Sequence, residues 1–410
     1  MIKWITDEIG TGPYKEIDKI DAEIIDVRDL VDKRGNSGDL INKKIDAAIA
    51  YLELKKKIII CCDYGMSRSN AIAIGVISKW HKIPFNEAIR QVVKTTNETQ
   101  IKIQVINVVR NTIENNNSKK IKKNRIDKIL VTGGTGYIGS NLTTQLKGKY
   151  KIFDPSSQEI DIINDLVELD LKVKEEQIDC LIHLANPRIV NTNNSIGESM
   201  VMMKNILDVC VENNCWLVYL SSMDIYGSYK NNDLMVKENR TPFPNGINGE
   251  TKFLCESLIN HYRKKFNLRT TVIRIKNIYG PDSKKPRFLY DFIHKAKNNL
   301  PITVHKYING YPKIDLLNIN DLISCILSVL KKGYQGELNI GSGQLVATKD
   351  LASLIINQLD SKSKIGIHHI HDKNDNFGID MAKVLKEIQW KPKVSLSKGL
   401  NDLILPYTNN

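Results

Sequence analysis

The glycine-rich stretch VTGGTGYIGS, residues 131–140, limits the fold of this chain more than any other feature. It follows an apolar run typical of a buried strand and leads into a helical pattern. Gly133, Gly136 and Gly139 would let the strand turn tightly into the helix and let backbone amides approach a diphosphate. An acid, Asp154, closes the next apolar strand about 20 residues further on. These features together predict a dinucleotide-binding site.

Strands and helices alternate after this stretch, which predicts an α/β fold built on a doubly wound parallel sheet. Ligands bind at the carboxyl ends of the strands in such sheets, so residues that follow the strands are candidate site residues. The predicted buried strands cover residues 126–132, 150–153, 180–184, 217–221, 269–275 and 337–340.

Length and composition predict two or three domains of an ordinary globular protein, because the 410 residues are 41% hydrophobic and 26% charged. The amino terminus lacks the apolar run of a signal peptide. No apolar stretch approaches the roughly 18 residues of a membrane span. The seven cysteines include no C-x-x-C pair, as is typical of a reducing compartment. We therefore expect a cytoplasmic protein that makes no contact with a membrane.

The net charge of +13 arises from 59 basic and 46 acidic residues and raises the question of nucleic-acid binding. No basic patch interleaved with aromatic residues and no nucleic-acid motif is found, so we expect no nucleic-acid partner. No metal site is expected either. The positive potential would still help to attract phosphorylated substrates.

Residues 1–115 predict a separate small α/β domain. A polar, basic stretch without periodicity, residues 116–125, predicts a linker to a second domain over residues 126–408. In the first domain the apolar runs predict strands at 22–25 and 57–60, and helical patterns cover 40–54, 69–80, 86–93 and 99–113.

The second of these strands leads into CCDYGMSRS, residues 61–69, with the spacing C-x-x-G-x-x-R-S between a strand and a helix. A short loop at a helix amino terminus directs amide groups at one centre, which would hold a phosphate dianion and lower the thiol pKa. Cys62 would attack phosphorus, and Arg68 would clamp two phosphate oxygens. The Ser69 hydroxyl would help the thiolate to leave.

This motif resembles the signature loop of the protein tyrosine and dual-specificity phosphatases, and the resemblance covers most of residues 1–115. It implies a phosphorylated sugar or a phosphoprotein as substrate, and an aspartate upstream of the loop as general acid. Asp32 is the candidate for that acid, with Asp29 and Asp26 as rivals. The family usually has a histidine before the nucleophile, where this chain has Cys61.

Motifs after the predicted strands of the second domain resemble those of another family. Together with the glycine-rich stretch they resemble the extended short-chain dehydrogenases/reductases, the NAD-dependent nucleotide-sugar epimerases, dehydratases and reductases. The resemblance implies a Rossmann-type sheet with a small substrate lobe, a nucleotide-sugar substrate and a homodimer. The motifs are HLAN at 183–186, SSMDIYG at 221–227, NGETK at 248–252, RIKNIYGP at 274–281 and QWKP at 389–392.

The resemblance also implies NAD as cofactor and assigns residues to it. His183 lies within a buried strand and is expected to be structural. The implied contacts are Gly133, Gly136, Tyr137, Ile138 and Gly139 at the pyrophosphate, Asp154 at the adenosine ribose, Asp161 and Ile162 at the adenine, Leu184 and Ala185 beside the nicotinamide, and Lys252 at the nicotinamide ribose.

The active site departs from the family pattern, in which a Tyr-x-x-x-Lys pair performs proton transfer. Lys252 is present, but Asn248 stands at the tyrosine position, and an amide has no proton to exchange near neutral pH. Ser222 matches the hydroxyl residue that polarises the same sugar hydroxyl. Asp224 stands where some dehydratases carry an acid, but its usual acidic neighbour is Met223, so dehydration is not expected.

Two interpretations follow, and Asn248 discriminates between them. In one, Asp224, Tyr226 or a bound water takes over proton transfer. The chain is then a bifunctional carbohydrate-pathway protein that joins an NAD-dependent epimerase- or reductase-like domain to a cysteine-dependent phosphatase-like domain. In the other, the second domain binds NAD or a nucleotide sugar without turnover, as a scaffold or sensor that regulates the phosphatase half. The family arginine before Asp315 is Ile314 here, so the grip on the nucleotide differs as well.

Overall fold

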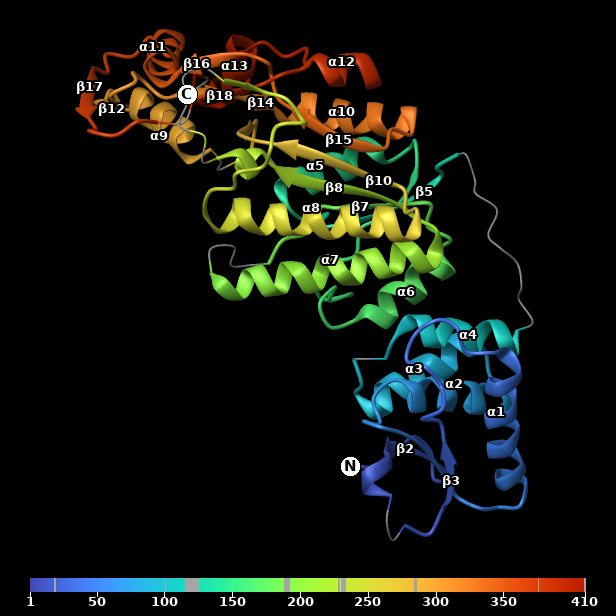
Figure 1. Cartoon of the computed structure of the whole chain (residues 1–410). Coiled ribbons are helices and arrows are strands. Elements are labelled where there is room, and N and C mark those ends of the chain that lie inside the picture. Colours follow the sequence, from blue (N-terminus) through green and yellow to red (C-terminus); the bar gives the residue numbers. More distant parts are fainter. Residues whose placement is uncertain are drawn as a thin grey trace. The chain divides into compact units, whose positions relative to one another are not determined.

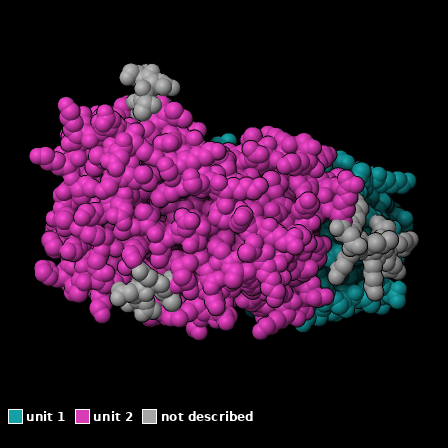
Figure 2. Space-filling view, turned by 90° about the horizontal axis from the view of Figure 1, so that it is seen from above, with its two compact units in different colours: residues 1–124, 157–177, 208–214 teal, residues 125–156, 178–207, 215–410 magenta. Residues whose placement is uncertain are grey.

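The computed structural model describes residues 1–17, 20–99, 101–114, 125–187, 192–227, 229, 234–283, 286–374 and 376–408. The predicted linker lies outside these residues except for Arg125. The chain divides into two compact units, coloured teal and magenta in Figure 2. Among the described residues, no helix is both long and apolar enough to cross a membrane. Unit 1 comprises residues 1–124, 157–177 and 208–214, and unit 2 comprises residues 125–156, 178–207 and 215–410.

Unit 1 contains a four-stranded sheet in the order β1-β2-β4-β3, in which only β1 is antiparallel to its neighbour. The central strand β4 is formed by five buried residues, IIICC, which suit a strand covered on both faces. The strands are β1 (Lys3–Trp4), β2 (Ile9–Pro13), β3 (Glu23–Asp26) and β4 (Ile58–Cys62). The helices are α1 (Gly38–Glu53), α2 (Arg68–Trp80), α3 (Phe85–Thr96), α4 (Ile103–Ile113) and α6 (Leu166–Glu175), with a short 3₁₀ turn at Tyr14–Glu16.

The sequence did not reveal strand β2, because its residues IGTGP lack an apolar pattern. A Cβ at Gly12 would lie 2.3 Å from Cδ1 of Ile2, so the missing side chain makes room for the neighbouring strand. Helix α4 also begins at Ile103, later than predicted.

Unit 2 is built on a six-stranded, fully parallel sheet in the order β15-β10-β8-β7-β5-β6. These are the six predicted strands, with ends shifted by one or two residues. The chain leaves β5 for β6 on one side and returns to β7 on the other, so the switch point of the sheet lies between β5 and β7. The strands are β5 (Lys128–Thr132), β6 (Lys151–Phe153), β7 (Cys180–His183), β8 (Trp216–Ser222), β10 (Thr270–Ile275) and β15 (Gly336–Ile340).

Helices cover both faces of this sheet, with α5 and α10 on one face and α7 and α8 on the other (Figure 1). Helix α10 shows why such helices begin and end where they do. The Asn318 side chain accepts a hydrogen bond from the Asn320 amide at its start, and Gly333 ends it at φ 62°. The helices are α5 (Tyr137–Leu146), α7 (Asn193–Asn213), α8 (Gly246–Phe266), α10 (Ile319–Lys332) and α12 (Ala382–Ile388), and the 3₁₀ turn η2 covers Met223–Tyr226.

The remaining part of unit 2 forms a smaller lobe with its own apolar core. The lobe is formed largely by the chain after β10. Its strands are β9 (Leu234–Val236), β11 (Ile278–Tyr279), β12 (Ile302–Lys306), β13 (Lys313–Asp315), β14 (Leu317–Asn318), β16 (Leu345–Ala347), β17 (Ile365–His369) and β18 (Phe377–Ile379), and its helices are α9 (Arg287–Lys297), α11 (Thr348–Gln358) and α13 (Leu396–Thr408).

The QWKP motif near the carboxyl terminus has a structural role. The Trp390 indole donates a hydrogen bond of 2.7 Å to Oγ of Ser324. The buried Asp321 carboxylate accepts from the amides of Lys393 and Val394, at 2.9 and 3.0 Å. These bonds fasten the last segment of the chain to α10.

Candidate functional site

The glycine-rich turn between β5 and α5 has no room for side chains. Gly133 has φ 75°, and a Cβ there would lie 2.7 Å from the Ala185 amide nitrogen at the end of β7. A Cβ at Gly139 would lie 2.1 Å from the Gly133 carbonyl oxygen. The backbone is therefore exposed at the amino end of a helix, which is the cradle that a diphosphate needs. This geometry fits NAD.

Asp154 lies against this turn. A Cβ added at Gly134 would lie 2.7 Å from the Cβ of Asp154. That position agrees with the predicted contact to a ribose. Asp161 and Ile162, predicted to face the adenine, belong to unit 1. The Asp161 carboxylate accepts from the Ile163 amide at 2.9 Å and stabilises its own turn. The adenine contact stays a prediction.

A cleft of about 880 Å³ opens at the carboxyl ends of the strands of unit 2. The glycine-rich turn and the ends of β7, β8 and β10 form its walls, with α8 contributing one side chain. The lining residues include Gly133, Gly136, Tyr137, Ile138, Gly139, Leu184, Asn186, Ser222, Asp224, Lys252 and Lys276.

Lys252 projects from α8 into this cleft and is only 8% exposed. Its ammonium group donates hydrogen bonds of 3.1 Å to Oδ1 of Asn186 and to the Leu220 carbonyl. Burial lowers the pKa of Lys252 to about 8. His183 is buried, its Nδ1 lies 2.7 Å from the Thr132 hydroxyl, and burial lowers its pKa to about 3. His183 is thus a neutral structural residue, as predicted.

Asn248 does not reproduce the tyrosine that it replaces. Its amide donates a hydrogen bond of 2.8 Å to Oδ2 of Asp224, whose other oxygen lies 3.2 Å from Nζ of Lys276. Burial raises the pKa of Asp224, but the charge of Lys276 and hydrogen bonds from Asn248, Lys276 and Ser222 lower it below its ordinary value. Asp224 is therefore an ionised, weakly basic carboxylate.

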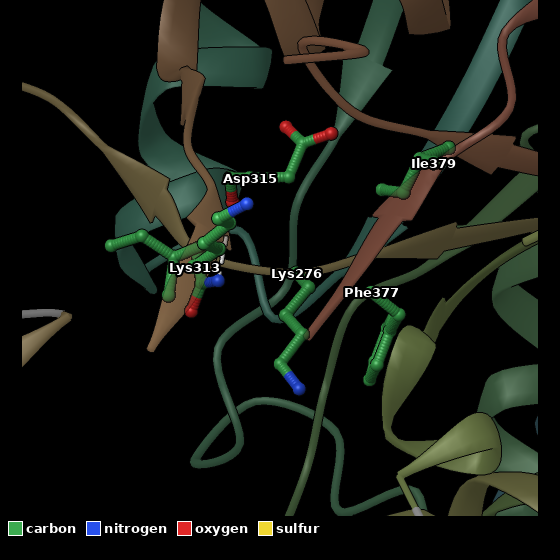
Figure 3. A pocket seen from close by; sticks show the side chains of 7 residues that line it. Lys276, Lys313, Asp315, Phe377 and Ile379 are labelled. Atoms are coloured by element: carbon green, nitrogen blue, oxygen red, sulfur yellow. Dashed lines mark hydrogen bonds between the residues drawn. The ribbon is translucent and has the colours of Figure 1, made fainter. Parts of the chain in front are cut away.

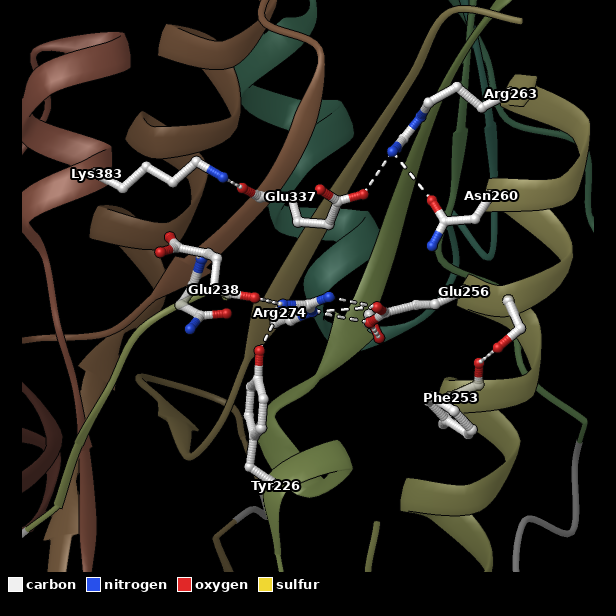
Figure 4. Close-up of polar contacts among 12 residues, drawn as sticks. Tyr226, Glu238, Phe253, Glu256, Asn260, Arg263, Arg274, Glu337 and Lys383 are labelled. Atoms are coloured by element: carbon white, nitrogen blue, oxygen red, sulfur yellow. Dashed lines mark hydrogen bonds and ion pairs between the residues drawn. The ribbon is translucent and has the colours of Figure 1, made fainter. Parts of the chain in front are cut away.

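Tyr226 is excluded as the replacement base, because it is fully buried and does not line the cleft. Its hydroxyl accepts a hydrogen bond of 2.6 Å from Arg274, and burial raises its pKa to about 12. Figure 4 shows Arg274 between Tyr226 and Glu256, whose carboxylate it holds with three hydrogen bonds of 2.7 to 3.1 Å. This buried ion pair joins β10 to α8 and supports the helix that carries Lys252.

A smaller pocket of about 50 Å³ lies beside the cleft and shares Lys276 with it (Figure 3). Lys313, Asp315 and Phe377 also line this pocket. The Asp315 carboxylate accepts from the Ser342 amide and hydroxyl, at 2.7 and 2.6 Å. Asp315 thereby holds a loop of the lobe. The positively charged residues that line the pocket are Lys276 and Lys313.

In unit 1, Cys62 ends β4, and the residues up to α2 form a loop at the amino end of that helix. Its Sγ lies 3.4 Å from Oγ of Ser69. Burial raises the pKa of the Cys62 thiol, but hydrogen bonds from Ser69 and from two loop amides outweigh burial and lower it. Burial instead raises the pKa of the neighbouring Cys61 to about 11. The two adjacent thiols therefore differ in reactivity.

Two side chains that the sequence analysis missed fix the shape of this loop. The Asn70 amide donates to the carbonyls of Gly65 and Met66, at 3.2 and 2.8 Å, and Oδ1 of Asn70 accepts from the Thr11 hydroxyl at 2.7 Å. Gly65 has φ 70°, and a Cβ there would lie 2.5 Å from the carbonyl carbon of Gly12. The side chain of Asn70 thus holds two carbonyl groups of the loop, those of Gly65 and Met66. No spacing in the sequence marks Thr11 or Asn70.

Arg68 links the loop to the segment that carries the predicted acids. It donates a hydrogen bond of 2.9 Å to the Leu30 carbonyl and forms an ion pair with Asp63. Asp32 follows in that segment and forms an ion pair of 2.8 Å with Lys102. Oδ1 of Asp32 is buried and has no hydrogen-bond partner among the described residues.

Of the rival acids, Asp26 is the less suited to donating a proton. It holds Arg28 with hydrogen bonds of 2.7 to 3.1 Å, and these lower its pKa. Asp29 forms an ion pair of 2.8 Å with Lys44, as Asp32 does with Lys102. Asp32 stays the predicted acid, with Asp29 as its rival.

Comparison with known proteins places residues 129–341, just over half of the chain, in the NAD dependent epimerase/dehydratase family. The chain is 26% identical to the dTDP-4-dehydro-6-deoxyglucose reductase of Escherichia coli, with 68% of this chain and 97% of the relative covered. It is 27% identical to the dTDP-D-glucose 4,6-dehydratase of Dictyostelium discoideum, with 70% and 82% covered.

Solved structures share the fold of unit 2. The dTDP-glucose 4,6-dehydratase of Bacillus anthracis, determined with NAD, matches with a TM-score of 0.60 at 23% identity, over 69% of this chain and 97% of that one. The UDP-glucose 4-epimerase of Thermus thermophilus, also determined with NAD, matches with a TM-score of 0.60 at 18% identity, over 69% and 99%. The match to the family agrees with the backbone cradle and the cleft. It confirms the prediction that the cofactor is NAD. The chain belongs to the NAD-dependent epimerase/dehydratase family.

Proposed function

We propose that unit 2 binds a nucleotide sugar beside NAD and acts as an epimerase- or reductase-like domain. One observation carries this proposal: a single cleft brings together the glycine-rich turn, Ser222 and Lys252. The curated relatives are named for reactions of dTDP sugars, which supports a nucleotide sugar as substrate. When bound, NAD supplies a reversible acceptor for hydride from a sugar carbon.

Residues of the chain would bind NAD and orient the sugar. The amides of the glycine-rich turn and the Asp154 carboxylate would hold NAD, and Lys252 would donate a hydrogen bond to its nicotinamide ribose. The Ser222 hydroxyl would orient the reacting sugar hydroxyl. No disulfide joins cysteines in the described part of the chain, which is consistent with the reducing cytoplasm that we propose as the location. A homodimer, implied by the family resemblance, remains part of the proposal.

The first test is mass spectrometry of the ligand released from the purified chain. The protein is then incubated with NAD and a panel of nucleotide sugars in deuterated water. Deuterium uptake or a changed sugar would support turnover and identify the substrate class. Bound NAD without conversion of any sugar would instead support the scaffold or sensor interpretation. The position of the usual base would then hold only Asn248, which donates a hydrogen bond to Asp224.

Asn248→Tyr tests the site more directly. We expect the conversion rate to rise on the order of 10²-fold, because the variant regains a proton-transferring hydroxyl four residues before Lys252. Asn248→Phe is the matched control, since it has the ring without the hydroxyl and should give no gain. If NAD binds to Asn248→Tyr and the rate does not rise, the binding interpretation is favoured.

A second proposal concerns unit 1, which we infer to be a cysteine-dependent phosphatase. The specific observation in its favour is geometric: Cys62 ends β4 with its Sγ 3.4 Å from Oγ of Ser69, and Arg68 and Ser69 begin α2 directly after the loop. Phosphate release from sugar phosphates and from phosphotyrosine peptides would show which substrate class is used. If both halves act on one carbohydrate pathway, a sugar phosphate should be preferred.

A further inference from the structure

We propose that Lys252 itself accepts the proton of the sugar hydroxyl, in the role that the missing tyrosine would otherwise have. This inference rests on the proposed function of unit 2 and adds the identity of its base. It differs from the usual division of roles, in which the lysine only binds the ribose and assists a tyrosine.

The other polar groups near the reacting position are engaged or unsuitable. The Asn248 amide cannot accept a proton, and it donates to Asp224. Asp224 is also paired with Lys276, and its lowered pKa makes it a poor base near neutral pH. The hydroxyl of Tyr226 is buried against Arg274, outside the cleft. The Ser222 hydroxyl accepts a hydrogen bond from the Asp224 amide, and a neutral hydroxyl is too weak a base to take the proton alone.

Lys252 is in the right place for this role. Its Nζ lies 3.1 Å from the Leu220 carbonyl, two residues before Ser222 on the same strand. Both side chains line the cleft. Asn248 and Lys252 are four residues apart on α8, so they lie on the same face of the helix. The amine of Lys252 therefore lies in the cleft, on the same side of α8 as the replaced tyrosine position.

Burial favours a neutral amine at Lys252, whereas the Tyr219 ring, whose centroid lies 4.8 Å from Nζ, favours the charged form. Its hydrogen-bond acceptors, Asn186 and Leu220, are uncharged. Within the described part of the chain, no carboxylate forms an ion pair with it. Glu256, one turn further along α8, is instead held by Arg274. Cys255 and Glu256 favour the charged form, but burial outweighs both and brings the pKa to about 8.

The proposed step is balanced as follows. The neutral Nζ takes the hydroxyl proton, so an O–H bond breaks and an N–H bond forms. The electron pair of the O–H bond becomes the second bond of a sugar ketone. The hydrogen on the same carbon leaves with its electron pair as hydride, and an oxidised nicotinamide is the acceptor. The ammonium form of Lys252 then returns the proton in the reverse direction.

The first test measures the protonation of Lys252 without any turnover. The full chain is pulsed with isotopically labelled acetic anhydride between pH 6 and 11, and acetylation of each lysine is measured by mass spectrometry. We expect the labelling midpoint of Lys252 near pH 8, with the exposed Lys331 of the same chain as internal control. A midpoint for Lys252 equal to that of Lys331 would overturn the proposal.

The second test uses Lys252→Arg, which keeps the positive charge but cannot give up its proton near neutral pH. NAD binding is measured in parallel, because Lys252 also belongs to the proposed ribose contact, and we expect sugar conversion at saturating NAD to fall by roughly 100-fold or more. Conversion at the wild-type rate would overturn the proposal. So would a wild-type protein that binds NAD and a nucleotide sugar but converts none. A protein that binds neither would instead overturn the proposed function, and the labelling midpoint would still decide the state of Lys252.

Discussion

The loop after β4 and the loop after β5 both join a buried parallel strand to the amino end of a helix. Each suits a phosphate group, because helix amino termini attract anions. They differ in what their side chains contribute. The loop after β4 is flanked by a thiol, an arginine and a hydroxyl, since Cys62 ends β4 and Arg68 and Ser69 begin α2. The loop after β5 depends on the absence of side chains, since a Cβ at Gly139 would collide with the Gly133 carbonyl.

The two proposed sites therefore differ in where their binding residues and their reacting residues lie. If unit 1 is the phosphatase that we propose, one short stretch holds both its nucleophile and its phosphate clamp, and a change there would affect binding and reaction together. In unit 2 the glycine-rich turn would only bind NAD, and the side chains proposed to act on the sugar, Ser222 and Lys252, come from β8 and α8. Unit 2 therefore keeps its cradle intact although Asn248 has replaced the usual base.

The largest effect is expected at Cys62. Cys62→Ser should reduce phosphate release by unit 1 on the order of 10⁴-fold or more, because the nucleophile is removed. Cys61→Ser is the matched control, since that buried thiol lies next to Cys62 but has a raised pKa. Steady-state phosphate release measures both variants. Equal losses in the two variants would mean that the loop is not a thiol phosphatase site.

Lys252→Met should stabilise the fold while it impairs function. The pKa of Lys252 is lowered from 10.5 to about 8 in the folded chain, so protonation of this residue opposes folding below pH 8. Up to about 3 kcal/mol of stability would be regained as the pH rises from 8 to 10.5, because the unfolded chain then binds more protons. The difference in unfolding free energy between Lys252→Met and the wild type should thus be largest near pH 7 and shrink by pH 10.5. A difference that does not depend on pH would contradict this prediction.

Gly139→Ala should weaken NAD binding about 100-fold, or about 2.7 kcal/mol, because the turn must shift to accept a Cβ. Isothermal titration calorimetry would measure the dissociation constant. Gly197→Ala is the control, since a Cβ there would meet no atom within 4 Å. Phosphate release by unit 1 should not change in either variant. An unchanged affinity in Gly139→Ala would mean that NAD does not bind at this turn.

Tyr226→Phe should give the smallest effect. It removes the hydrogen bond to Arg274 and should lower the unfolding free energy by about 2 kcal/mol, since the partner is a buried charge. Sugar conversion should remain at the wild-type rate. Loss of conversion in a folded variant would return Tyr226 to the candidates for the base.

Much of the fold was predictable, because apolar periodicity and glycine spacing are local properties. The six parallel strands of unit 2 were all predicted from their apolar runs. Strand β2 was missed, since Gly12 and Pro13 break the apolar pattern and only the neighbouring strand explains them. The Cys62 motif could be recognised because the residues predicted to act together follow one another within eight positions.

The parallel sheet of unit 2, the glycine-rich turn, the spacing around Cys62 and the replacement of tyrosine by Asn248 could all be recognised in the amino-acid sequence. How the chain accommodates that replacement depends on tertiary contacts. The contact of Asn248 with Asp224, the pairing of Asp224 with Lys276 and the burial of Lys252 involve residues of η2, of α8 and of the segment after β10. Side-chain pKa values depend on burial and on charges across such contacts, and no local spacing in the chain contains that information.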